Sequence, residues 1–142
     1  MNTLNDFYLK LGEIVFNYQL LENDLRKIYA CIRKGSIEDN LEYARLNFKG
    51  LGQVIISLRE LDNSDNKPYF SNEDYELLLE LTHKRNFYCH KVSMKFIYIN
   101  NFIESKKFSD TFNELLSDTL RIRSIAEQAE KIRIEVFNLY RR

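Results

Sequence analysis

The two histidines of this chain, His83 and His90, are the side chains best suited to acid–base chemistry at neutral pH. An imidazole titrates near neutrality, so it can take a proton from one oxygen and give a proton to another. Five residues before His90 stands Arg85, whose guanidinium can hold a phosphate with two hydrogen bonds. Asn86 lies four residues before His90, so it shares a helix face with the imidazole. This set suits reactions at phosphorus, in which charge builds up on the phosphate oxygens.

The same stretch is the clearest cationic window of a chain whose charges otherwise cancel. Lys and Arg number 21 and Asp and Glu number 21, so the formal net charge is zero. No acidic residue occurs between Glu80 and Glu104, whereas basic residues recur there. Such a window attracts a ligand that carries phosphate. The residues of this window predicted to bind substrate are His83, Lys84, Lys91 and Lys95.

Metal binding and cysteine catalysis are not expected from these residues. His83 and His90 have no carboxylate or cysteine at a recognisable ligand spacing, so no metal site and no cofactor is predicted. Adjacent helical residues point about 100° apart, so Cys89 is expected to face the core if His90 faces solvent. Cys31 is expected to be buried as well. Glu22 is either an ordinary surface acid, which we favour, or reaches the motif helix and orients Arg85.

Long helices must position these residues, because the sequence is poor in the residues that make turns. It holds one proline and four glycines, too few for a sandwich or a barrel. Apolar residues recur every three or four positions in four long segments, which is the spacing of an amphipathic helix. The helices expected from this pattern cover residues 3–33, 38–62, 72–91 and 109–142.

Three parts of the chain interrupt the regular helical spacing, and the structure of two of them is ambiguous from the sequence. Gly50 and Gly52 interrupt the second segment, so it is either one helix, which we favour, or a short helix followed by another from about Phe48. Residues 62–71 are polar and are expected to form a loop. Residues 93–104 fit a pair of short strands, an extension of the preceding helix, or an irregular loop.

The sequence therefore predicts an all-α protein with a single domain over residues 1–142, built as an antiparallel bundle of four, or four to five, helices. Two cysteines are too few for a disulfide scaffold. No apolar run approaches the roughly 20 residues of a membrane span, and the first residues lack the pattern of a signal peptide. We expect a reduced, cytoplasmic protein with no membrane partner.

The motif and its setting resemble a known superfamily. Arg85-Asn86-x-x-x-His90 resembles the Arg-Asn-x-x-x-His form of the signature of HEPN domains (higher eukaryotes and prokaryotes nucleotide-binding), which are all-helical. Here too the motif lies on the third expected helix, after a long loop. The stretch from Tyr18 to Leu25 is similar to the aromatic-x-x-Leu-Glu-x-x-Leu pattern common in that superfamily.

This resemblance implies a metal-independent endoribonuclease of a toxin–antitoxin or abortive-infection system, active on RNA as a homodimer. Two motif helices would meet across a twofold axis, with His90 as acid or base and its symmetry mate as the partner. Arg85 would hold the scissile phosphate, and Asn86 would orient the imidazole or donate to the phosphate. The product would carry a 2′,3′-cyclic phosphate, and an antitoxin or another protein inhibitor would be a further partner.

One departure from the superfamily bears on regulation. In one toxin branch a tyrosine that the antitoxin modifies stands two residues after the histidine, and here that position is Val92. The departure favours an abortive-infection-like or stand-alone member. The alternative function is a catalytically inactive HEPN-like module that dimerises or binds a partner protein or a nucleotide. A third alternative is an unrelated helical adaptor, in which the spacing of Arg85 and His90 is a coincidence.

Overall fold

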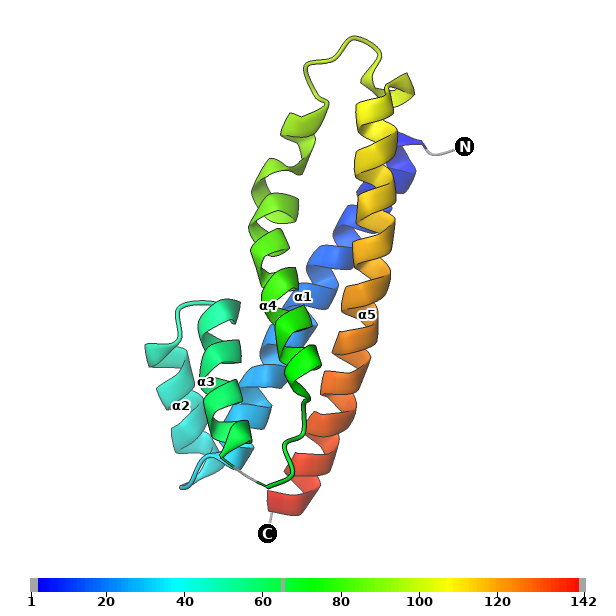
Figure 1. Ribbon diagram of the computed structural model, residues 1–142. Coiled ribbons are helices and arrows are strands. Elements are labelled where there is room, and N and C mark those ends of the chain that lie inside the picture. The colour runs from blue at the N-terminus through cyan, green and yellow to red at the C-terminus, as the bar shows by residue number, and fades with distance from the viewer. Residues whose placement is uncertain (1–2, 65, 141–142) are drawn as a thin grey trace.

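In the residues that the structure describes, 3–64 and 66–140, this computed structural model contains five α-helices that run alternately down and up (Figure 1). They are α1 (Leu4–Ile32), α2 (Ile37–Asn47), α3 (Leu51–Asn63), α4 (Asn72–Asn86) and α5 (Lys106–Tyr140). No strand occurs in these residues, so the predicted all-α class is confirmed. No helix in this part of the chain is both long and apolar enough to span a membrane.

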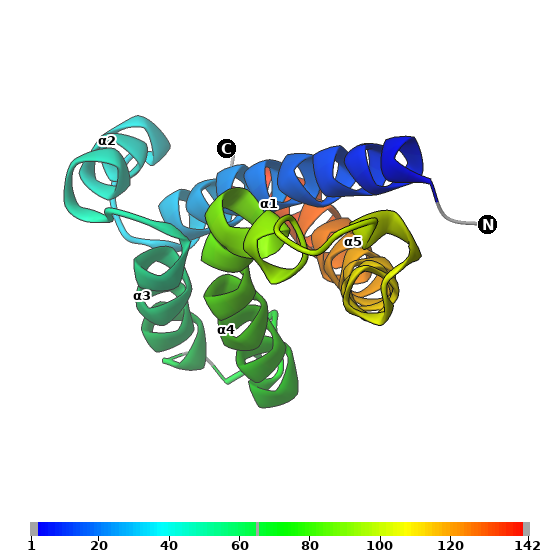
Figure 2. The same ribbon diagram turned by 90° about the horizontal axis from the view of Figure 1, so that it is seen from above.

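The first and last helices make the most extensive contact of the bundle and run in the same direction. Near one end the ring of Phe7 lies 5.5 Å from that of Phe108 and 5.8 Å from that of Phe112. Further along both helices, Glu13 of α1 pairs with Arg123 of α5. Because successive helices alternate in direction, the first and the fifth are parallel, so the predicted antiparallel arrangement holds between consecutive helices. Seen from above, α4 lies between α3 and α5, and α2 lies at the outside (Figure 2).

The segment expected as one helix over 38–62 is two helices, so the favoured single helix was wrong. The chain is extended at Phe48, and α3 begins after Gly50. The ring of Phe48 is buried 5.0 Å from that of Tyr29, and Arg26 of α1 donates to the carbonyl oxygen of Phe48 at 3.2 Å. These contacts offset the hydrogen bonds that a continuous helix would have kept. The resulting α2–α3 hairpin flanks the lower half of the bundle in Figure 1.

The helix ends follow from the local sequence. The hydroxyl of Ser36 accepts the backbone N–H of Asp39 at 3.1 Å, and the hydroxyl of Ser71 accepts that of Asp74 at 3.0 Å, as N-caps do. After α1 the chain turns at Gly35, whose φ of 107° lies in the region that only glycine enters without strain. Each cap fixes where a helix of the hairpin or of α4 begins.

The segment that the sequence left open, 93–104, contains no strand; it begins within a 3₁₀ turn that directly follows the helical residues before it and is otherwise mostly irregular. One 3₁₀ turn covers Val92–Lys95, at the start of the segment, and a second covers Phe102–Glu104, at its end. Phe96 is buried, with its ring 5.4 Å from that of Phe7 and 5.0 Å from that of Phe108. This aromatic contact holds the segment over the end of the bundle, where it connects the last turn of α4 to α5 (Figure 1).

Candidate functional site

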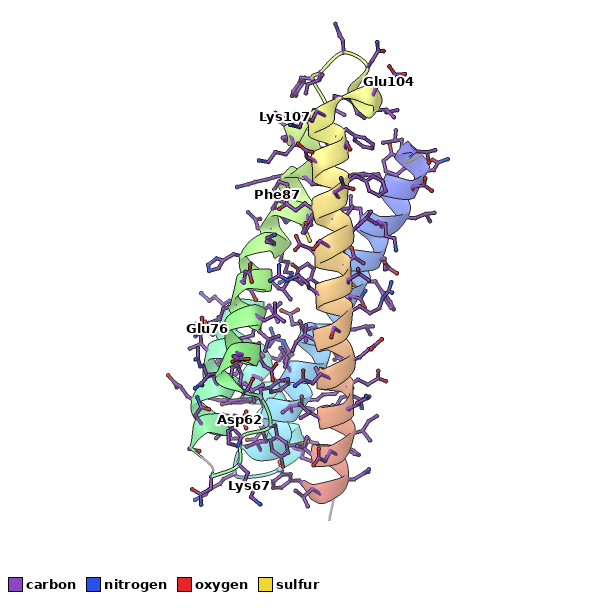
Figure 3. The ribbon with its side chains drawn as sticks, turned by 45° about the vertical axis from the view of Figure 1, so that its right-hand side comes forward. Asp62, Lys67, Glu76, Phe87, Glu104 and Lys107 are labelled. Atoms are coloured by element: carbon purple, nitrogen blue, oxygen red, sulfur yellow. The ribbon has the colours of Figure 1, made fainter. Side chains whose placement is uncertain are left out.

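The α-helical part of α4 ends at Asn86, and the chain continues in one π-helical turn, Phe87–Lys91 (Figure 3 labels Phe87). In such a turn the backbone hydrogen bonds run from residue i to residue i+5. Arg85 and His90 are five residues apart, so the turn brings them toward one face. In an ideal α-helix the same two side chains would point about 140° apart, and Arg85 would have to curl back.

Arg85, Asn86 and His90 line one open pocket of about 560 Å³, which we call the Arg85 pocket. Cys89 lines it beside His90, and Gly50–Gly52 at the start of α3 lines it from the other side. The side chain of Arg85 is 35% exposed, and those of Asn86 and His90 are exposed. None of the described residues that line this pocket is acidic. The pocket therefore suits an anion such as a phosphate.

The N-terminal end of α3 lies at the wall of this pocket, where Gly50, Leu51 and Gly52 line it. The first N–H groups of a helix have no partner inside the helix, and a partial positive charge gathers there. Gly50 is the N-cap and makes no side-chain cap hydrogen bond to them. A single helix through Gly50 and Gly52, as expected from the sequence, would have had no N-terminus at this pocket. Reading Gly50 as an N-cap would have revealed this helix end.

Arg85 also faces Glu22 of α1. The Nη1 atom of Arg85 and the Nη2 atom of Arg26 each lie 3.7 Å from the Oε1 atom of Glu22. These distances are longer than those of a hydrogen bond, so the carboxylate draws both cations electrostatically and leaves the donors of Arg85 free to turn. Glu22 thus faces the motif helix, which was the less favoured of the two expectations, and its side chain is 22% exposed between two arginines.

Behind the motif, a buried carboxylate on α5 holds this part of α4 in place. Asp118 is 1% exposed and accepts hydrogen bonds from the Tyr88 hydroxyl, from Lys84 Nζ at 2.8 Å and from Arg121 Nη1 at 3.1 Å. Burial, and then the Asp118 carboxylate, raise the pKa of the Tyr88 phenol far above its ordinary value. Lys84, predicted to bind substrate, thus contacts α5 and not the described lining of the Arg85 pocket.

The other three residues predicted to bind substrate lie in three different settings. Lys91 lines a second pocket, on the far side of His90. The Nζ atom of Lys95 lies 5.8 Å from the ring centre of Phe87. His83 is exposed and is not among the described residues of the Arg85 pocket. The structure therefore places Lys91 beside His90, whereas neither His83 nor Lys95 belongs to the described lining of the Arg85 pocket.

Cys89 is exposed, so the expectation that it faces the core was wrong. The π turn changes which residues face inward, and Tyr88, at 2% exposed, takes the buried place. Cys89 then lies beside His90 on the wall of the Arg85 pocket. Cys31 is buried, as expected. The change in helix type could not be predicted from the sequence, because apolar spacing alone does not distinguish a π turn from an α-helix.

Neither metal ligation nor comparison with known proteins adds to this description. Among residues 3–64 and 66–140, no cluster of three or more His, Cys, Asp or Glu side chains is placed to hold a metal ion. No family model, curated protein or solved structure matches this chain. Function is therefore inferred from the side chains of the pocket and their geometry.

Proposed function

We propose that this chain is a HEPN-like endoribonuclease that cleaves RNA without a metal ion at the Arg85 pocket. The observation that carries the proposal is the convergence of Arg85, Asn86 and His90 on one pocket, opposite the start of α3. A guanidinium, an amide and helix N–H groups supply hydrogen bonds to phosphate oxygens, and an imidazole supplies proton transfer.

The proposed reaction uses the RNA's own 2′-hydroxyl as the nucleophile. Its oxygen bonds to the adjacent phosphorus while the bond from phosphorus to the 5′-oxygen breaks, which leaves a 2′,3′-cyclic phosphate and a free 5′-hydroxyl. One group must take the proton of the 2′-hydroxyl, and another must protonate the leaving oxygen. His90 serves as one of them, while Arg85 and Asn86 donate to the non-bridging oxygens, where charge develops.

A second copy of the chain supplies the other acid–base group in this proposal. His90 is the only histidine among the described residues that line the Arg85 pocket. A twofold axis close to His90 would bring in the imidazole of the partner subunit, and the exposure of His90 and Lys91 leaves this surface open to such an approach. The active site is then composite and forms at a homodimer interface.

The proposed role is that of a toxin or phage-defence ribonuclease in the cytoplasm, restrained by an antitoxin or another protein inhibitor. It rests on the resemblance of the motif to HEPN ribonucleases. Cleavage of cellular RNA on phage infection, or on loss of the inhibitor, would stop growth of the cell.

One observation favours the alternative of a catalytically inactive module. Glu22 lies 3.7 Å from Arg85 within the same subunit, and an arginine that stays paired in this way serves structure instead of catalysis. In that case the Arg85 pocket would bind a nucleotide or a partner protein without reaction.

RNA cleavage by purified protein in excess chelator distinguishes the two functions. We expect the wild type to leave 2′,3′-cyclic phosphate ends, and His90→Ala and Arg85→Ala each to be slower by roughly 100-fold or more. Arg45→Ala is the matched control, because Arg45 lies exposed on α2 and pairs only with Glu42 among the described residues. Equal traces of cleavage from all four proteins would refute the enzyme and leave the binding module.

A further inference from the structure

A second pocket, of about 230 Å³, lies on the far side of His90, and we call it the Tyr8 pocket. Cys89 and His90 line both this pocket and the Arg85 pocket, so the two share one wall. The proposed reaction uses the Arg85 pocket and assigns nothing to its neighbour. A chain of nucleotides held at the first pocket would therefore pass directly beside the second.

The floor of the Tyr8 pocket is apolar and largely aromatic. Phe7, Tyr88, Val92 and Phe96 form it, and each of them is at most 4% exposed. The rings of Phe7 and Phe96 meet edge to face at 5.4 Å, which fixes the shape of the floor. A rigid apolar floor favours a flat ring over a hydrated polar group.

The rim of the Tyr8 pocket is polar and exposed. Tyr8 of α1, at 58% exposed, stands opposite the π turn and presents a phenol ring. Lys91 and Ser93 stand on the other side, and their side chains have no hydrogen-bond or ion-pair partner among the described residues. No acidic side chain belongs to the described lining. The rim thus offers one ring for stacking and two donors for the edge of a ligand.

We propose that the Tyr8 pocket binds the nucleobase of a nucleotide whose phosphate lies in the Arg85 pocket, an inference that rests on the proposed ribonuclease function. The base stacks on the ring of Tyr8 above the apolar floor, and Lys91 and Ser93 donate to its edge. The volume is below the roughly 300–1,000 Å³ of pockets for drug-sized ligands, which fits one base and no larger group. The base next to the cleaved bond then lies in this pocket.

The expected contribution follows from stacking. A base on an aromatic side chain contributes about 1–3 kcal/mol, or roughly 5- to 150-fold in affinity. The phosphate contacts of the neighbouring pocket are independent of the base and depend on salt. Removing the base from the probe and removing Arg85 from the protein therefore test two separate contributions to the binding of one ligand.

The test measures binding of two short RNA probes by fluorescence polarisation. One is a 2′-O-methyl oligonucleotide, which cannot be cleaved, and the other has the same backbone without bases. We expect the wild type to bind the base-bearing probe at least about 5-fold more tightly than the abasic probe. Tyr8→Ala should remove this difference, Tyr8→Phe should keep it, and Phe16→Ala, an exposed aromatic elsewhere on α1, should leave both affinities unchanged.

The outcomes separate this inference from the function on which it rests. Arg85→Ala should weaken both probes by the same factor, and an unchanged affinity in that variant would count against the proposed function alone. Equal binding of the two probes by the wild type would overturn the base pocket and leave the phosphate site intact. Binding of neither probe at millimolar concentration would overturn both. If Tyr8→Ala binds both probes as the wild type does, stacking on Tyr8 is refuted and the base pocket is overturned.

Discussion

Replacing Asp118 with alanine tests whether one buried carboxylate holds the motif segment against α5. Asp118 is 1% exposed and accepts hydrogen bonds from Tyr88, Lys84 and Arg121. Two of these donors lie on α4 and its π turn, on either side of Arg85 in the sequence. Loss of the carboxylate therefore releases the segment that carries the predicted catalytic residues.

The size of this destabilisation depends on how far water can reach each donor once the carboxylate is gone. The Tyr88 hydroxyl is on a side chain only 2% exposed, so leaving it without an acceptor costs about 1–3 kcal/mol. Lys84 and Arg121 are 29% and 34% exposed and keep Glu114 and Glu80 as partners. Losing the hydrogen bond from each of these two cations to Asp118 therefore costs less than about 1 kcal/mol of unfolding free energy. We expect Asp118→Ala to lower the free energy of unfolding by about 3 kcal/mol, at the lower end for a broken buried ion pair.

Urea denaturation followed by far-UV circular dichroism measures this loss, since the chain has no tryptophan to report on unfolding. With a slope of about 2 kcal/mol per molar urea, the midpoint should fall by about 1.5 M. Tyr88→Phe, which keeps the ring, should cost only about 1 kcal/mol. Asp110→Ala, an exposed acid on the same helix, should stay within about 0.5 kcal/mol of the wild type. An Asp118→Ala protein as stable as Asp110→Ala would refute the reasoning.

Three further perturbations test the fold away from the motif. Asp62 accepts the backbone N–H groups of Tyr69 and Phe70 and the hydroxyl of Tyr75 (Figure 3 labels Asp62), so Asp62→Asn should lower the free energy of unfolding by about 2 kcal/mol, measured in urea. Gly35→Ala should cost about 1 kcal/mol, seen as a lower melting temperature, because φ at this position is 107°. Burial raises the pKa of Glu13, and hydrogen bonds from two cations outweigh it, so the pKa lies below its ordinary value. Glu13→Gln should therefore cost about 0.5 kcal/mol at neutral pH. This difference between Glu13→Gln and the wild type is fully present above the ordinary glutamate pKa of about 4.3 and should vanish as the pH falls through the lower pKa of the folded state. A difference that persists in acid would show that the charge of Glu13 is not its cause.

The long helices could be predicted from apolar spacing because each of them buries one face along its whole length. α1 covers Leu4–Ile32 where the pattern predicted 3–33. The break between α2 and α3 was harder to predict, since it depends on Phe48 packing against Tyr29 and on Arg26 reaching from another helix. Such contacts join residues far apart in the sequence and leave no periodic signal.

The candidate site was predictable only in its polar residues. Arg85, Asn86 and His90 follow from side-chain type and spacing, whereas the π turn that gathers them is seen only in the fold, where Tyr88 is buried and donates to Asp118 of α5. Asp118 had a signal of its own, because it lies three residues after one apolar position of its helix stripe and four before another. An acid on a buried stripe indicates a paired carboxylate. Its partners become visible only in the fold.

The two histidines permit a direct test of the central claim, that the Arg85 pocket holds the phosphate of RNA beside His90. A carbon–proton spectrum of the labelled protein contains one set of imidazole signals for His90 and one for His83. On titration with a 2′-deoxy dinucleotide, which keeps the phosphate but cannot be cleaved, we expect the His90 signals to shift and those of His83 to stay. Arg85→Ala should weaken the shift. Binding that leaves the His90 signals unmoved would contradict the assignment of the site.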